Sequence, residues 1–143
     1  MNFSSSWVVY ALGSALFAAL TAVFGKLGVM GLNSNLATFI RTLVILAVIA
    51  GILSLRHEWQ KPSGIAASSW LFLILSGIAT GLSWLCYYRA LQLGPVSKVA
   101  PVDKLSVAIA IVLGLLFLGE QLSWPLALGG LLIVAGSIVI IAF

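Results

Sequence analysis

Five apolar stretches dominate the sequence, and each is close to the ~20 residues that an α-helix needs to cross the hydrocarbon core of a membrane. They cover residues 7–30, 35–55, 69–93, 101–118 and 124–143. A backbone polar group left without a hydrogen bond in lipid is costly, so a spanning segment must be a helix or part of a closed barrel. Barrel strands alternate in polarity, whereas these runs are continuous and rich in Leu, Ile and Ala. The sequence therefore predicts an all-α integral membrane protein, a five-helix transmembrane bundle.

The composition supports a lipid environment and excludes several classes of function. Of the 143 residues, 62% are hydrophobic and 7% are charged, against about 25% charged in an ordinary soluble domain. The net charge of +4 comes from seven Lys/Arg and three Asp/Glu, which is too sparse for a nucleic-acid interface. The single cysteine, Cys86, excludes an intrachain disulfide, and His57 has no nucleophile or metal cluster beside it in sequence. We expect no enzyme, no cofactor, no metal site and no nucleic-acid partner.

The segments between the runs carry turn and capping signals. Asn33 or Ser34 is a suitable N-cap for the second helix, and Gly119 suits the C-terminal end of the fourth. Residues 94–100 begin with a Gly-Pro turn pair and are expected to form a loop. Pro101 then falls in the first turn of the fourth helix, where its missing N–H has no partner to lose.

Five charged residues lie inside the predicted spans: Lys26, which is close to the end of the first, and Arg41, Arg89, Asp103 and Lys104. Charges within a span are expensive and usually face a polar interior. One interpretation is structural: a long side chain can extend to the headgroups, and Asp103 can sit at a helix N-terminus or pair with Arg41 or Arg89. The other interpretation is that the basic groups attract the anionic part of a solute, while Asp103 holds them in place or carries a coupled proton.

The third span also carries aromatic residues beside its arginine. Trp84 and Tyr88 are four residues apart and share a helix face. They can belong to an interfacial aromatic belt, or they can pack the apolar part of an anionic or zwitterionic solute. The candidate substrate-binding residues are Arg41, Trp84, Tyr88, Arg89, Asp103 and Lys104.

Two stretches resemble one known family. Residues 90–105, ALQLGPVSKVAPVDKL, resemble the loop between the third and fourth spans of the EamA-domain family, within the drug/metabolite transporter superfamily. The run FLGEQL at residues 117–122, followed by Gly129, Gly130 and residues 134–136, resembles the end of the same domain. Arg41 matches the arginine that the family carries early in its second span. The resemblance covers nearly the whole chain and implies a single EamA-like domain over residues 1–143.

The resemblance implies a fold and a class of function. Members usually have ten spans in two inverted five-span repeats, and such repeats build a midplane site with alternating access. This chain carries one repeat, so the resemblance implies a half-size transporter that works as a homodimer, parallel or antiparallel, or as a heterodimer with a paralogue. The expected function is efflux of metabolite or drug-like small molecules across a prokaryotic inner membrane. The expected partners are membrane lipid and the solute.

A second function from a different class remains open on the sequence. The chain can be a non-transporting membrane assembly or accessory subunit, whose charges pair with those of a partner protein. A solvent-reachable cavity distinguishes the two functions, because a transporter needs one and an accessory subunit does not.

Overall fold

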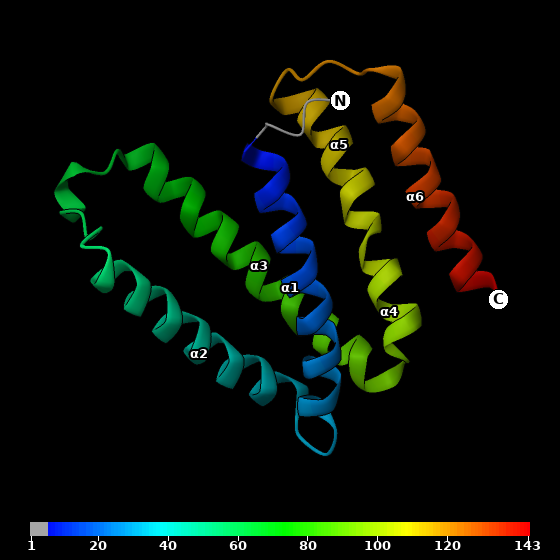
Figure 1. The fold of residues 1–143 in the computed structure, drawn as a ribbon, viewed down its shortest axis with the longest axis horizontal. Coiled ribbons are helices and arrows are strands. Elements are labelled where there is room, and N and C mark those ends of the chain that lie inside the picture. The colour runs from blue at the N-terminus through cyan, green and yellow to red at the C-terminus, as the bar shows by residue number, and fades with distance from the viewer. Residues whose placement is uncertain (1–5) are drawn as a thin grey trace. The chain divides into compact units, whose positions relative to one another are not determined.

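The computed structural model describes residues 6–143, and residues 1–5 of the predicted domain lie outside the described range. Its elements are α1 (Ser6–Val29), α2 (Ser34–Leu55), the short 3₁₀ helix η1 (Pro62–Gly64), α3 (Ala67–Leu93), α4 (Val96–Asp103), α5 (Leu105–Phe117) and α6 (Trp124–Ala142) (Figure 1). Five stretches are long and apolar enough to cross a membrane, with α4 and α5 forming one of them together. The predicted all-α membrane class with five spans is confirmed.

The helix ends follow the capping signals. The side-chain oxygen of Asn33 accepts hydrogen bonds from the N–H groups of Asn35 and Leu36, at 2.9 and 3.3 Å. Two of the first free N–H groups of α2 are thereby satisfied. Gly119 follows the last turn of α5 with a φ of 67°, the left-handed conformation in which glycine commonly ends a helix.

The fourth span differs from its predicted form in two ways. It begins at Val96, because the carbonyl of Pro95 accepts the N–H groups of Lys98 and Val99 at 3.1 and 3.0 Å. The Gly-Pro turn therefore leads directly into a helix, and Pro101 lies inside α4 rather than in its first turn. The helix is interrupted at Lys104, whose N–H bonds to the carbonyl of Pro101 three residues back. A proline within a helix removes one backbone bond and favours such a break.

The chain forms two compact units, which we name by their helices. The α2–α3 unit, residues 25–92, contains the last turn of α1, all of α2 and nearly all of α3. Its buried residues gather where the ends of these three helices meet: Gly25, Val29, Ser34, Ala37, Thr38, Tyr88 and Leu91. Most other large apolar side chains of the unit are exposed, as expected for helices that face lipid.

The α4–α6 unit contains residues 93–143 and the part of α1 up to Phe24. Within it, α6 packs along both α4 and α5 (Figure 1). The buried hydroxyl of Ser137 on α6 donates to the carbonyl of Pro101 at 3.1 Å. Gly130 on α6 lies beside Ile111 on α5, so a Cβ at Gly130 would stand 3.3 Å from the end of that side chain. The hydrogen bond from Ser137 to Pro101, which we call the polar clip, and the close contact at Gly130 therefore hold α6 against the interrupted span formed by α4 and α5.

Candidate functional site

A glycine lets α1 and α3 approach closely at one end of the α2–α3 unit. A Cβ built on Gly25 would stand 3.2 Å from the hydroxyl oxygen of Tyr88 and 3.4 Å from Leu91. Tyr88 and Leu91 are almost fully buried, with 5% and 0% of their surfaces exposed. Small residues permit such backbone approach in membranes, where no hydrophobic force drives helices together. Tyr88 can therefore occupy this buried position only because residue 25 has no side chain.

Polar groups join the same helix ends. The Nζ of Lys26 donates to the carbonyl of Leu91 at 2.5 Å. The side-chain amide of Gln92 donates to the carbonyls of Val29 and Leu32, at 3.3 and 2.5 Å. The carbonyls of Val29 and Leu32 lie at the end of α1 and in the turn that follows it, where the helix supplies no further backbone N–H donors. Lys26 and Gln92 thus form an end latch between α1 and α3.

Arg41 projects from α2 onto two aromatic rings of α3. Its Cζ lies 3.9 Å from the centroid of the Trp84 ring and 5.4 Å from that of Tyr88. Both separations are within the ~6 Å range of cation–π attraction. The structure therefore brings together three of the six candidate residues, and we call Arg41, Trp84 and Tyr88 the arginine seat.

One donor of the arginine seat has no partner in the described structure. The Nη1 atom of Arg41 is buried, and no described residue accepts a hydrogen bond from it. A buried donor without an acceptor costs about 1–3 kcal/mol, and more when it is charged. The ring of Trp84 holds the guanidinium in position, while the Nη1 atom of that guanidinium can still donate a hydrogen bond to an acceptor.

The other three candidate residues lie elsewhere. Arg89 is exposed and donates from Nη1 to the side-chain oxygen of Gln92 at 2.9 Å, so it adjoins the end latch. Asp103 and Lys104 belong to the α4–α6 unit, where their charged groups pair at 3.4 Å. Asp103 is the last residue of α4. Asp103 also directly precedes Lys104, the N-cap of α5. It therefore lies at the junction of two helices, where the C-terminal dipole of α4 and the N-terminal dipole of α5 act on its charge with opposite signs.

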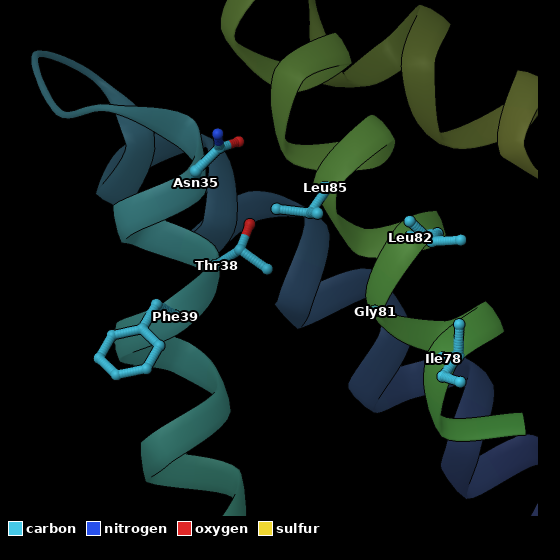
Figure 2. A pocket seen from close by; sticks show the side chains of 7 residues that line it. All are labelled: Asn35, Thr38, Phe39, Ile78, Gly81, Leu82 and Leu85. Atoms are coloured by element: carbon cyan, nitrogen blue, oxygen red, sulfur yellow. The ribbon is translucent and has the colours of Figure 1, made fainter. Parts of the chain in front are cut away.

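An apolar groove runs between α2 and α3, and the sequence interpretation did not anticipate it. Its volume is about 450 Å³, and it is widely open at the surface of the unit. Figure 2 shows the side chains that line it. The lining residues are Asn35, Thr38 and Phe39 of α2 and Ile78, Gly81, Leu82 and Leu85 of α3. The hydroxyl of Thr38 already donates to the carbonyl of Ser34 at 2.9 Å. The spacing Gly77-x-x-x-Gly81 is typical of a close-packing helix face, but a Cβ at either glycine would meet no other atom within 4 Å, so this face of α3 is open in the described chain.

The groove adjoins the arginine seat. Thr38 lies three residues before Arg41 on α2, and Gly81 lies three residues before Trp84 on α3. Residues three apart are neighbours on a helix surface. A cationic group and an apolar groove are therefore adjacent within the α2–α3 unit.

Comparison with known proteins identifies one transporter family and two relatives that are named as transporters. Residues 5–142 match the EamA-like transporter family. The chain is 55% identical over 140 residues to a Sinorhizobium protein named uncharacterized transporter in cobO 3′ region, covering 98% of this chain and 99% of that one. It is 28% identical to the uncharacterized transporter YxxF of Bacillus subtilis, covering 92% of this chain and 41% of that protein. No solved structure matches.

Proposed function

The chain belongs to the EamA-like transporter family, and on this premise we propose that it exports small anionic or zwitterionic solutes across a prokaryotic inner membrane. The observation that supports an anionic solute is the arginine seat. Arg41 lies within a helix long and apolar enough to span the membrane, and its buried Nη1 lacks an acceptor among the described residues. A carboxylate or phosphate oxygen would satisfy this donor with a charge-assisted hydrogen bond.

We assign different roles to the other candidate residues. Trp84 and Tyr88 hold the guanidinium in place by cation–π contact. Arg89 and Lys104 are exposed cations, which raise the local concentration of anionic solute by long-range attraction. Asp103 neutralises part of that field through its pair with Lys104.

The proposed working unit is a dimer with alternating access. The Bacillus subtilis relative is longer, and this chain spans only 41% of its length. A second copy of this chain, or a paralogue, would supply a second five-span repeat, and inverted repeats build midplane sites that open alternately. In the loops and at the helix ends, two Lys/Arg lie on each side of five spans, Arg56 and Lys61 against Lys26 and Lys98. Such a balance favours neither orientation under the positive-inside rule and is compatible with antiparallel copies. Adding the cations within the helices, Arg41, Arg89 and Lys104, gives five on one side and would instead favour an N-terminus outside.

Orientation can be measured directly. In a variant with Cys86→Ser, single cysteines at Lys61 and at Ser97 report the two opposite sides of the membrane. An impermeant thiol reagent applied to intact cells should label both positions to about half if the chain inserts in both orientations. Complete labelling at one position and none at the other would exclude an antiparallel homodimer, leaving an oppositely oriented paralogue as the second repeat.

The anion role is tested by transport. Purified protein in liposomes should take up at least one solute from a radiolabelled panel of carboxylates, phosphate esters and amino acids. Arg41→Gln should lower that uptake about tenfold or more, because hydrogen bonds to charged groups are worth about 1.5–3 kcal/mol. Arg41→Lys should restore little, since lysine lacks the planar fork.

The control for charge loss is Arg56→Gln. Arg56 is exposed and pairs with Glu58 at 3.6 Å in the loop after α2, so this variant removes a cation outside the arginine seat. Its uptake should match that of the wild type. Equal uptake by the wild type and Arg41→Gln would contradict the binding role, and no uptake of any panel solute would favour the accessory-subunit function.

A further inference from the structure

We propose that the apolar groove between α2 and α3 binds the hydrocarbon part of an amphipathic anion whose charged end is held by Arg41. This inference rests on the proposed function and narrows its substrate class to single-chain or aryl-alkyl carboxylates and similar anions. The reason begins with the aromatic rings, since Trp84 and Tyr88 are already engaged by the guanidinium. The apolar part of a solute therefore needs a different surface.

The groove supplies that surface in the right place. Phe39, Ile78, Leu82 and Leu85 give it apolar walls, and its volume of about 450 Å³ lies within the ~300–1,000 Å³ range of small-molecule sites. Figure 2 shows the amide of Asn35 near one end, with the apolar side chains of α3 along the rest. Almost the whole surface of the groove is nevertheless apolar, so the charged end of a solute needs Arg41 beside it.

Charge complementarity selects an amphipathic anion over other occupants. An apolar helix from a second copy could fill the groove, but it would leave the Nη1 of Arg41 buried and without an acceptor. That outcome is unfavourable in lipid, where water cannot replace the missing bond. An anion with an attached hydrocarbon satisfies both surfaces at once. Arg41 also lies seven residues into α2, about 10 Å along the axis at ~1.5 Å per residue, which favours a single-chain solute over a bilayer phospholipid anchored at headgroup depth.

The structure offers a matched pair of variants for this site. A Cβ at Gly81 or at Gly77 meets no atom within 4 Å, so either position accepts a side chain. Gly81 lines the groove and Gly77 does not. Gly81→Leu should therefore fill the groove, while Gly77→Leu adds the same apolar bulk one turn away on the same helix. Gly81→Ala is the milder variant should Gly81→Leu fold poorly.

The readout is the fluorescence of Trp84. A protein in which Trp7, Trp59, Trp70 and Trp124 are changed to Phe retains it as the sole tryptophan of the sequence. In phosphatidylcholine nanodiscs, two quenchers are titrated: 4-bromobenzoate and 4-(4-bromophenyl)butyrate, which carries three additional methylene groups. The uncharged comparison is 4-(4-bromophenyl)butan-1-ol.

The quantity to compare among the variants is the affinity of the longer acid divided by that of 4-bromobenzoate. In the wild-type groove, the longer acid should bind about tenfold more tightly than 4-bromobenzoate, because buried methylene groups add favourable transfer free energy. The ratio should persist in Gly77→Leu, fall toward one in Gly81→Leu and take an intermediate value in Gly81→Ala. The alcohol should quench without saturating in every variant.

Each failure has a separate meaning. An unchanged ratio in Gly81→Leu would overturn the groove assignment while leaving anion binding at Arg41 intact. Loss of preference for both acids over the alcohol, with no effect of Arg41→Gln, would instead remove the proposed anion site itself. Crosslinking of two copies through Ile78→Cys in place of ligand binding would show that a second chain covers the groove, and it would also overturn the inference. Quenching of Trp84 by brominated phospholipid to the same extent as by the acids would assign the groove to bilayer lipid.

Discussion

The two units of this protein differ in the surroundings that they give to charged residues within the spans. In the α2–α3 unit, Arg41 stands against two aromatic rings, with a buried donor that no described residue accepts. In the α4–α6 unit, Asp103 and Lys104 pair with each other at a helix break, and their side chains are 36% and 54% exposed. Exposed pairs contribute little to stability, whereas a fixed cation with spare donor capacity is suited to recognition. Under the proposed function, the α2–α3 unit recognises the solute, whereas the α4–α6 unit contains a helix break at Lys104.

The largest effect should come from removing the close approach that forms the arginine seat. Gly25→Leu places a side chain where the Cβ alone would lie 3.2 Å from the Tyr88 hydroxyl. Overpacking of this kind typically costs about 1–3 kcal/mol, measurable as a lower free energy of unfolding in SDS titration. Gly28→Leu is the control, because a Cβ there meets no atom within 4 Å. Equal destabilisation by both variants would show that the seat does not depend on Gly25.

A smaller loss is expected from the end latch. Gln92→Leu removes the donor that reaches the carbonyls of Val29 and Leu32. At ~0.6 kcal/mol for each hydrogen bond in a membrane protein, the variant should lose about 1 kcal/mol in the same titration. Gln121→Leu, at an exposed loop position, should lose none. An unaffected Gln92→Leu would mean that helix packing and the bond from Lys26 to the Leu91 carbonyl join α1 to α3 without Gln92.

The clip on the broken span should be weaker still. Ser137→Ala deletes the bond to the Pro101 carbonyl, and the expected loss is about 0.6 kcal/mol. The Pro101 carbonyl keeps its bond from the Lys104 N–H, so it is not left unsatisfied. Ser106→Ala, at an exposed position on α5, controls for loss of a hydroxyl. A loss of several kcal/mol at Ser137 would indicate that the clip, rather than the proline, sets the break.

The smallest effect is expected at the exposed pair. Asp103→Asn removes one charge from a partly exposed interaction of 3.4 Å, and the free energy of unfolding should change by less than about 0.5 kcal/mol. Removal of the charge at Arg41 should instead weaken anion binding about tenfold or more. A large stability loss in Asp103→Asn would show that the pair is structural and would reverse the contrast between the two units.

The spans could be predicted from the sequence because a helix that crosses lipid needs about 20 consecutive, mostly apolar residues. The ends of α1, α2, α3 and α6 fall within about two residues of prediction, close to the usual uncertainty of helix ends. The start of α4 at Val96 was missed because the Gly94-Pro95 turn pair was interpreted as the beginning of a loop over residues 94–100. Pro95, however, was the signal for a helix start, since its carbonyl accepts the first helical bond.

The candidate site was predictable only in part. Helical periodicity placed Trp84 and Tyr88 on one face, but the approach of Arg41 to that face depends on how α2 and α3 are aligned along their axes. The groove depends on the same alignment, and from the sequence Phe39 and Leu82 look like ordinary lipid-facing residues. Likewise, the position of Asp103 between the end of α4 and the N-cap of α5 follows from the break at Lys104, which local propensity did not reveal.

Access to the arginine seat from water tests the central claim most directly. With Cys86 changed to Ser, a cysteine at Thr38, three residues before Arg41, should react with an anionic methanethiosulfonate about tenfold faster than with a cationic one of similar size. Arg41→Gln should remove this preference, and a cysteine at Ser97 should keep the same rate ratio with or without Arg41. Protection of the Thr38 cysteine from both reagents in every condition would contradict the account, because a solute site must be open to water in at least one state.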